Sequence, residues 1–401
     1  MKMTPVRAAI VMGHPAQQFT RGLQLLSDEQ EIELHVYYRS TARSFKDPGF
    51  NREVSWDVDL LGGYDWSAPP HSITMPAARA RWFIQRLRSD RPEIVICYGW
   101  GSTIARECIM YCMLARVPIL LYGDSTWQHP TGGRGGLIRA VLLRAVTMLC
   151  SGAVSTGTFN REFYIRYGMH PRRIWPGVCP ADTEAFEGAR TEARNDKAAS
   201  PHHLSIGFAG KLIPRKGVKD LLEAAALLPR SRDWSVTIVG DGPLLGELQD
   251  LVQGLGLVDR VVFRGFANTS EMPKLLASFD VVVVPSHMDM RALVTIEAMA
   301  AGATIVVSDA TAVWGAGDLV QHGITGLVYP AQRPDALATQ LASLLDDPDL
   351  LAMLCANGTA RVSNFGPEAF ARTMKAAIVG YSHLHGLRAG TQGRTSTTTE
   401  P

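Results

Sequence analysis

The chain has 401 residues, of which 46% are apolar and 19% are charged. This length exceeds what one ordinary hydrophobic core uses, so we expect two domains. The formal net charge of +2 gives no reason to expect nucleic acid as a partner. The six cysteines lie scattered, mostly in apolar runs, which favours buried thiols in a reducing cytoplasm over a metal site.

Neither the first residues nor the most apolar segment predicts a targeting or membrane-spanning element. The apolar run in MKMTPVRAAIVMGHP is too short for a secretory signal and predicts a first strand. Residues 136–154 are the most lipid-like, but Arg139 and Arg144 interrupt them before the roughly 20 apolar residues of a span are reached. We therefore predict a helix running into a strand there, in a cytoplasmic protein.

Short apolar segments alternate with helical segments along the chain, the pattern of parallel α/β sheets. The predicted strands are 8–12, 33–37, 94–98, 119–122 and 153–155, then 205–209, 235–239, 261–263, 281–284, 304–307 and 326–328. We expect two doubly wound domains, residues 1–187 and 204–365, that bind ligands at the carboxyl ends of their strands. The polar stretch 188–203 between them is interpreted as a linker.

The end of the chain falls into two parts. Residues 366–387 predict a last helix that packs back toward the N-terminal domain. Residues 388–401 are rich in Gly and Thr and offer no apolar anchor, so they predict a disordered tail.

An acidic pair in the stretch VVVVPSHMDMRALVTIEAMAAGATIVVSD, residues 281–309, is the strongest functional signal. The pattern predicts a buried strand, a loop with Asp289 and a helix that carries Glu297. Asp289 then precedes a helix N-terminus, where backbone N–H groups favour an anion. Glu297 lies two turns further, where it can accept hydrogen bonds from paired hydroxyls. A nucleotide sugar, with its diphosphate at the helix start, would suit this arrangement.

Two other strand ends of the same half carry candidate donor-binding residues. In GFAGKLIPRKG, Gly210 ends a strand, and Lys211 and Lys216 flank a tight loop from which both could reach a diphosphate. A solvated basic loop is the alternative. In FRGF, Arg264 and Phe266 could hold a base, although a core Phe in a connector is comparably probable.

The series GKLIPRKG, VGDGP, FRGF, PSHMDMRALVTIEAMAAG and HGITGLVYP resembles the donor half of the retaining glycosyltransferases of family 4, the group 1 glycosyltransferases. The segment AVSTGTFNREFYIRYGMHPRRIWPGVCPADTEAF resembles the part that closes the family's acceptor domain. The resemblance implies the GT-B fold, in which two Rossmann-like domains face each other across a cleft. It also implies a nucleotide-diphosphate sugar as donor substrate, with no cofactor and no required metal.

The resemblance assigns roles to this donor half. It implies that Glu297 binds the ribose, that Asp289 contacts the donor sugar, and that the amides after Asp289 hold the phosphates. The expected donor-binding residues are Gly210, Lys211, Lys216, Arg264, Met290, Arg291, Ala292, Leu293 and Glu297. The chain departs from the family, which usually has Glu at 289, Arg at 211, a small and an aromatic residue at 290 and 291, and Gly at 292. These departures fall in the loops that the resemblance assigns to the donor, so the sequence does not define the sugar.

The first domain should supply the acceptor pocket. We predict Asp124, which follows an apolar strand, as a catalytic residue with Asp289, although a turn or N-cap Asp is about equally probable. His14 and His129 are candidate acceptor-side residues; a surface or capping role is somewhat more probable for each. Trp56 lies in an aromatic and acidic stretch that could stack on sugars or pack on itself.

Residues 79–92 predict a basic helix. It could contact the anionic inner face of a membrane, or it could cover a sheet and expose its arginines to water.

We therefore predict a retaining, metal-independent glycosyltransferase that acts on a glycan, a lipid-linked sugar or a small molecule. A sugar-nucleotide epimerase on the same fold is one alternative. A nucleotide-sugar-binding homologue without turnover is the other.

Overall fold

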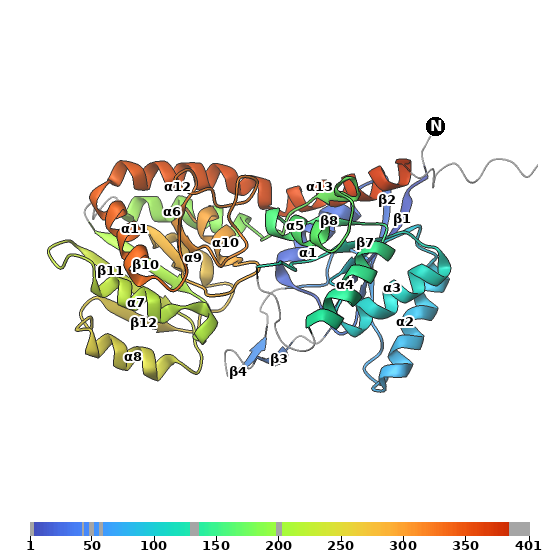
Figure 1. Ribbon diagram of the computed structural model, residues 1–401, viewed down its shortest axis with the longest axis horizontal. Coiled ribbons are helices and arrows are strands. Elements are labelled where there is room, and N and C mark those ends of the chain that lie inside the picture. The colour runs from blue at the N-terminus through green and yellow to red at the C-terminus, as the bar shows by residue number, and fades with distance from the viewer. Residues whose placement is uncertain are drawn as a thin grey trace, which may run out of the picture.

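The computed structural model describes residues 4–41, 44–47, 52–55, 59–128, 136–197 and 203–384. These residues form two α/β domains side by side, each built on a parallel sheet (Figure 1). The predicted fold class is thereby confirmed. The predicted tail, 388–401, lies outside the described residues.

The N-terminal sheet is parallel throughout, with the strand order β5-β2-β1-β6-β7-β8-β9. Its strands are β1 (Val6–Met12), β2 (Ile32–Tyr38), β5 (Trp66–Ser67), β6 (Ile94–Tyr98), β7 (Ile119–Tyr122), β8 (Gly152–Ser155) and β9 (Ile174–Pro176). The order reverses at β1, and ligands bind at such a point in doubly wound sheets. A separate antiparallel hairpin consists of β3 (Ser44–Asp47) and β4 (Arg52–Ser55).

Helices cover both faces of this sheet. They are α1 (Gln17–Ser27), α2 (Pro76–Asp90), α3 (Thr103–Ala115), α4 (Gly136–Leu149) and α5 (Thr158–Arg166), joined by α13 (Pro367–Leu384) from the end of the chain. Ala8 and Ile10 of β1 pack in a core with α1 and α13, whereas Ala9 and Val11 pack in a core with α2 to α5. The two-residue side-chain period of a strand thus divides the domain into two apolar layers.

The C-terminal sheet is also parallel, with the order β12-β11-β10-β13-β14-β15. Its strands are β10 (Leu204–Ala209), β11 (Trp234–Val239), β12 (Val261–Gly265), β13 (Val281–Val284), β14 (Thr304–Ser308) and β15 (Leu327–Tyr329). In β13, Val281 and Val283 face one core and Val282 and Val284 the other. Burial on both faces explains why this strand is an unbroken apolar run.

The helices of the C-terminal domain are α6 (Glu184–Lys197), α7 (Val218–Ala226), α8 (Leu245–Gly254), α9 (Met272–Ala277), α10 (Val294–Ala300), α11 (Pro334–Asp346) and α12 (Pro348–Val362). The helix α6 corrects the predicted linker 188–203, most of which is helical. Phe186 and Ala189 of α6 are buried in the core that contains α9 and α10. Glu184 and Glu187 stand in its first turn, where acidic side chains are favourable. The sequence of α6 after Ala189 is polar and charged, so it resembles a linker.

Beyond α12 the chain leaves the C-terminal domain, and the last described helix, α13, lies along the N-terminal domain (Figure 1). Phe370 and Met374 are buried in the N-terminal core with α1. The Phe370 ring lies 5.8 Å from the ring of Phe19 and 6.0 Å from that of Tyr122. The end of the described chain therefore completes the domain in which the chain begins.

We expect Phe370→Ala to lower the free energy of unfolding of the N-terminal domain by about 3 to 4 kcal/mol, because it leaves a cavity in a closed core. Calorimetric unfolding measures this loss. Arg372→Ala, an exposed site on the same helix, is the control and should leave the transition unchanged. Equal transitions in the two variants would contradict a core role for α13.

Candidate active site

A cavity of about 240 Å³ lies between the domains, at the carboxyl ends of β10, β11 and β12. Residues of both domains line it, including Gln17 and Gln18 at the start of α1, Gly210, Gly240, Phe266, Asn268, Leu293 and Glu297. The structure thus brings together Gly210, Leu293 and Glu297, which the sequence predicted as donor-binding. Gly240 allows the strand ends to meet: its φ is +143°, and a Cβ there would lie 1.8 Å from the carbonyl oxygen of Gly210.

Glu297 is a carboxylate without a protein partner at the wall of this cavity. Among the described residues, no hydrogen bond or ion pair of its side chain is found. Burial raises the pKa of Glu297 to about 7. A buried acceptor of this kind requires a partner, and hydroxyls of a ligand in the cavity would supply one.

Asp289 organises the loop between β13 and α10. Its Oδ2 lies 2.5 Å from Nζ of Lys216, which ends the 3₁₀ turn Pro214–Lys216 after β10. Its Oδ1 accepts hydrogen bonds from the amides of Arg291, at 3.2 Å, and Ala292, at 3.0 Å. Burial alone would raise the pKa of Asp289, but Lys216 and these amides hold it below its usual value. The two amides are therefore already used, and the cavity wall continues with Leu293 and Val294.

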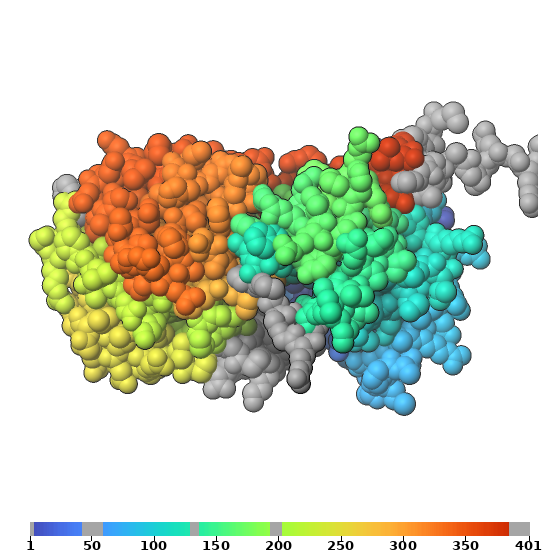
Figure 2. All heavy atoms as spheres, in the orientation of Figure 1, coloured from blue at the N-terminus to red at the C-terminus, as the bar shows by residue number. Residues whose placement is uncertain are grey.

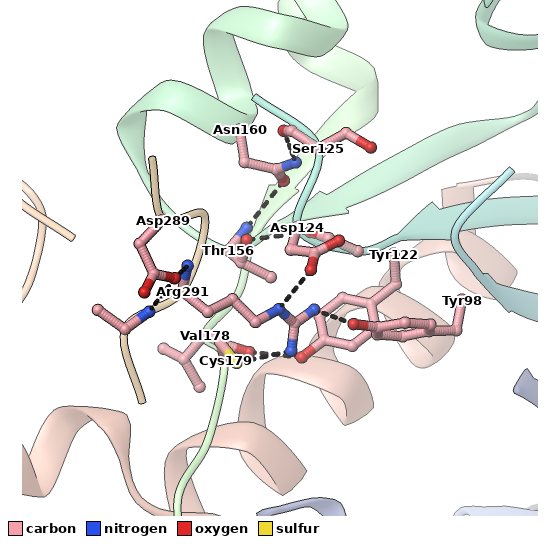
Figure 3. Close-up of polar contacts among 12 residues, drawn as sticks. Tyr98, Tyr122, Asp124, Ser125, Thr156, Asn160, Val178, Cys179, Asp289 and Arg291 are labelled. Atoms are coloured by element: carbon pink, nitrogen blue, oxygen red, sulfur yellow. Dashed lines mark hydrogen bonds and ion pairs between the residues drawn. The ribbon is translucent and has the colours of Figure 1, made fainter. Parts of the chain in front are cut away.

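Arg291 extends from this loop into the N-terminal domain (Figure 3). Its Nε lies 3.0 Å from Oδ2 of Asp124, an ion pair outside hydrogen-bond geometry. Its terminal nitrogens donate to the hydroxyl of Tyr98 and, at 2.9 Å, to Sγ of Cys179. The guanidinium also lies 5.8 Å from the ring centre of Phe19 and 5.1 Å from that of Tyr98. A residue that departs from the family pattern thus joins the two domains.

A second contact between the domains caps a helix. The N-cap residue of α5 is Gly157, which offers no side-chain acceptor. Oδ1 of Asp318, from the C-terminal domain, accepts the hydrogen bond of the Thr158 amide at 2.9 Å instead. Nearby, the rings of Phe159 and Trp314 lie 5.5 Å apart, edge to face. A Ser or Asp next to the helix usually caps it. Here Asp318 of the other domain does so.

A second cavity, of about 590 Å³, lies at the carboxyl ends of β1 and β6 in the N-terminal domain. Its lining includes His14, Gln18 and Tyr98, together with Arg39 and Arg79. Gln18 also lines the first cavity, so the two adjoin. The sequence predicted His14 here. It did not single out Arg39, and it gave Arg79 only as part of the basic helix 79–92; the fold brings these two arginines, 40 residues apart, to one cavity.

The remaining predicted residues lie in different places. Arg264 is exposed on the edge strand β12, and Met290 is exposed in the loop after Asp289; the lining of the first cavity includes neither. Lys211 directly follows Gly210 at the cavity wall. Trp56 and His129 lie outside the described residues.

Two facing doubly wound domains, with a ligand-sized cavity where their strand ends meet, define a GT-B protein. Comparison with known structures agrees. The crystal structure of HepE from Anabaena, in complex with UDP and glucose, matches with a TM-score of 0.69 and 18% identity. The match covers 94% of this chain and all of that one. The predicted GT-B fold is confirmed.

Sequence comparison identifies the family. A family model for group 1 glycosyl transferases matches residues 189–361. An uncharacterized glycosyltransferase of Methanocaldococcus jannaschii is 37% identical over 294 residues, 69% of this chain and 73% of that protein. The mannosyltransferase LpsB of lipopolysaccharide core biosynthesis, from Rhizobium meliloti, is 33% identical over 316 residues, 76% of this chain and 84% of that protein. The chain belongs to the group 1 glycosyltransferases.

Other relatives match over a shorter stretch. The alpha-D-kanosaminyltransferase of Streptomyces kanamyceticus is 33% identical over 180 residues. This match covers 44% of the present chain, and the chain spans 46%, about half, of the length of that relative. The shared family therefore leaves the sugar and the acceptor undefined.

We expect Glu297→Gln to stabilise the ligand-free protein increasingly as the pH rises. The pKa of Glu297 is raised from 4.5 to about 7, so its contribution to stability is complete below about pH 4.5 and is lost as the pH rises through 7. Gln cannot ionise and avoids this loss. The variant should gain about 2 kcal/mol relative to the parent at pH 8, after discounting for solvent in the cavity. Thermal unfolding between about pH 5 and 8 measures the difference, with the exposed Glu247→Gln as control. A pH-independent difference would refute the assignment.

We expect Arg291→Met and Asp124→Asn to be coupled in a double-mutant cycle by about 1 to 2 kcal/mol, because each removes the same partly shielded ion pair. Calorimetric unfolding of the four proteins gives the coupling. The exposed pair Arg333 and Asp335 is the matched control and should show no measurable coupling. Additive effects at Arg291 and Asp124 would mean that their contact does not hold the domains together.

Proposed function

We propose that this chain transfers a sugar from a nucleotide-diphosphate sugar to a hydroxyl of an acceptor, with retention of anomeric configuration and without a metal ion. The single observation that carries the proposal is the cavity between the domains, with the unpartnered carboxylate of Glu297 in its wall. Glu297 would accept hydrogen bonds from the ribose hydroxyls. Phe266 and Asn268 would lie along the base, and Leu293 and Val294 would offer amides to the diphosphate.

Positive charge from this chain would neutralise the departing diphosphate. Lys211 follows the cavity residue Gly210, and Lys216 is drawn to the same side by Asp289. Because Asp289 is occupied by Lys216 and two amides, we assign it a positioning role: it holds the loop that forms the phosphate side of the cavity. Cationic side chains would thus stabilise the charge that a metal ion neutralises in other sugar transferases.

The acceptor would enter through the adjoining second cavity. In a retaining transfer, the leaving phosphate oxygen takes the acceptor's proton on the face from which the phosphate departs, so the chain needs no separate general base. Because Asp124 is paired with Arg291, we assign it a positioning role too: it holds the guanidinium of Arg291 between the two domains. Arg39 and Arg79 in the second cavity support an acceptor that carries phosphate or carboxylate. The relative LpsB is described as an enzyme of lipopolysaccharide core biosynthesis. A lipopolysaccharide core is an example of a large anionic acceptor that would fit this charge.

The proposal is tested by titrating nucleoside diphosphates and their 2′-deoxy forms into the protein by calorimetry. One nucleoside diphosphate should bind, and loss of the 2′-hydroxyl should weaken it. Glu297→Ala should weaken binding of the ribonucleoside diphosphate roughly 10- to 100-fold, because a hydrogen bond to a charged group is lost. The same variant should no longer distinguish ribose from deoxyribose. Glu247→Ala, an exposed carboxylate of the same domain, is the control.

Product analysis separates the alternatives. Transfer should release a free nucleoside diphosphate and should persist in the presence of a chelator. The product should have the anomeric configuration of the donor. A changed nucleotide sugar without released nucleotide would favour an epimerase. Binding without turnover on any acceptor would favour a non-catalytic homologue.

A further inference from the structure

The surface of α4 and α3 departs from what a folded, solvent-facing domain normally shows. α4 has the sequence GLIRAVLLRAVTML, apolar around most of its circumference, yet Leu143 and Thr147 are its buried residues. The exposed apolar side chains on this surface are Leu137, Ile138, Val141, Leu142, Met148 and Leu149 of α4, with Met110, Met113 and Leu114 of α3. A helix apolar on nearly all sides is normally covered, and an exposed patch of this kind marks a contact surface.

The two helices share one side of the N-terminal sheet. Cys108 and Cys112 of α3 and Leu143 of α4 belong to the same core, opposite α1 and α13. In Figures 1 and 2, α4 lies on the viewer's side of the N-terminal domain, and no described segment of the chain covers it. The exposed apolar side chains of the two helices therefore lie on the same side of the sheet, and we call them together the α3–α4 face.

Positive charge surrounds this face. With 3.6 residues per turn, the exposed apolar side chains of α4 cover an arc of about 140°, and Arg144 and Arg139 fall beyond its two opposite edges. The helix α4 has no acidic residue. Neighbouring α2, which packs on the same side of the sheet, adds four arginines and one acid, Asp90. Apolar side chains flanked by arginines are typical of helices that lie in a membrane interface, where the guanidinium groups reach the lipid phosphates.

We propose that the α3–α4 face docks on an anionic lipid bilayer. The charge decides between this and a second copy of the chain. A two-fold contact through α4 would place Arg139 and Arg144 close to the same residues of the other copy without acidic partners. An anionic bilayer complements both the apolar surface and the arginines. Docking is peripheral, since no helix in the described part of the chain has the length and apolar composition to cross a bilayer.

The location of the face gives the docking a consequence for the acceptor. The guanidinium of Arg139, in the first turn of α4, lies 5.1 Å from the ring centre of Trp100. Trp100 stands between Gly99 and Ser102, which line the second cavity. The amino end of α4 is therefore beside the mouth of the proposed acceptor cavity. Docking would bring this mouth to the lipid headgroups, where an acceptor anchored in the bilayer presents its hydroxyl; this consequence rests on the proposed function, whereas docking itself does not.

The membrane contact proposed here lies on α4, not on α2, where the sequence predicted it. The sequence suggested residues 79–92, but in α2 Phe83 and Leu87 are buried and the arginines Arg81, Arg86 and Arg88 face water. This helix therefore covers the sheet, the alternative we had considered for it. Its arginines add to the positive potential, and the apolar contact falls on α4.

Sedimentation of the full chain with vesicles tests the proposal, in the absence of nucleotide sugar. The protein should bind vesicles of equal parts phosphatidylcholine and phosphatidylglycerol more strongly than pure phosphatidylcholine, and salt should weaken the binding. The variant L137S/I138S/L142S should lose at least roughly tenfold in partitioning, because three exposed apolar side chains no longer insert. The variant R139Q/R144Q should lose up to about 25-fold on anionic vesicles.

The matched control is L227S/V258S/I324S, which changes three similarly exposed apolar residues of the C-terminal domain and should bind as the parent does. Unchanged thermal unfolding and nucleotide binding would show that each variant is folded. Absence of vesicle binding, or equal binding by the α4 variant, would overturn the proposal. The proposal would also be overturned if light scattering showed that the parent protein is a dimer and that the α4 variant is a monomer. Transfer to a water-soluble acceptor should be unaffected in the α4 variant, which separates failure of docking from failure of the proposed chemistry.

Discussion

The ion pair between Lys216 and Asp289 is the constraint on which the donor side of the cleft depends. It ties the turn after β10 to the loop after β13, two strand ends that are adjacent in the sheet but 73 residues apart in the chain. The same carboxylate fixes the amides of Arg291 and Ala292. With these bonds in place, Arg291 points into the other domain, and Leu293 and Glu297 face the cavity. The low pKa of Asp289 keeps this arrangement charged and intact at neutral pH.

Polar contacts join the two domains at the cleft. Arg291 meets Asp124, Tyr98 and Cys179, and Asp318 caps α5 across the boundary. Such contacts are directional, so they favour one relative placement of the domains. The helix α13 returns the chain to the first domain and buries Phe370 there, against Phe19 and Tyr122. A cleft bounded this way keeps both cavities adjacent at Gln18.

Much of the fold followed from local pattern. The strands of both sheets agree with prediction to within a few residues at each end, because strands buried on both faces produce apolar runs such as Val281–Val284. Short or irregular elements were missed: β5 and β9 have too few residues to show a period. The linker prediction for 188–203 was wrong because the sequence of α6 after Ala189 is as polar and charged as a loop. Relatives at 33–37% identity confirm that the chain belongs to the group 1 glycosyltransferases, as the motif series implied.

The sequence by itself determined the fold class, the family and the strand ends from which the donor site is built, since these depend on short-range periodicity and on motifs contiguous in the chain. It could place Gly210, Asp289 and Glu297 at such ends. It could not show that Asp289 is occupied by Lys216, that Arg291 pairs with Asp124, or that Arg39 and Arg79 share a cavity. It also could not show that α4, predicted only as a helix running into a strand, is left uncovered by the rest of the described chain. Those facts depend on which distant segments become neighbours, and only the tertiary structure decides that.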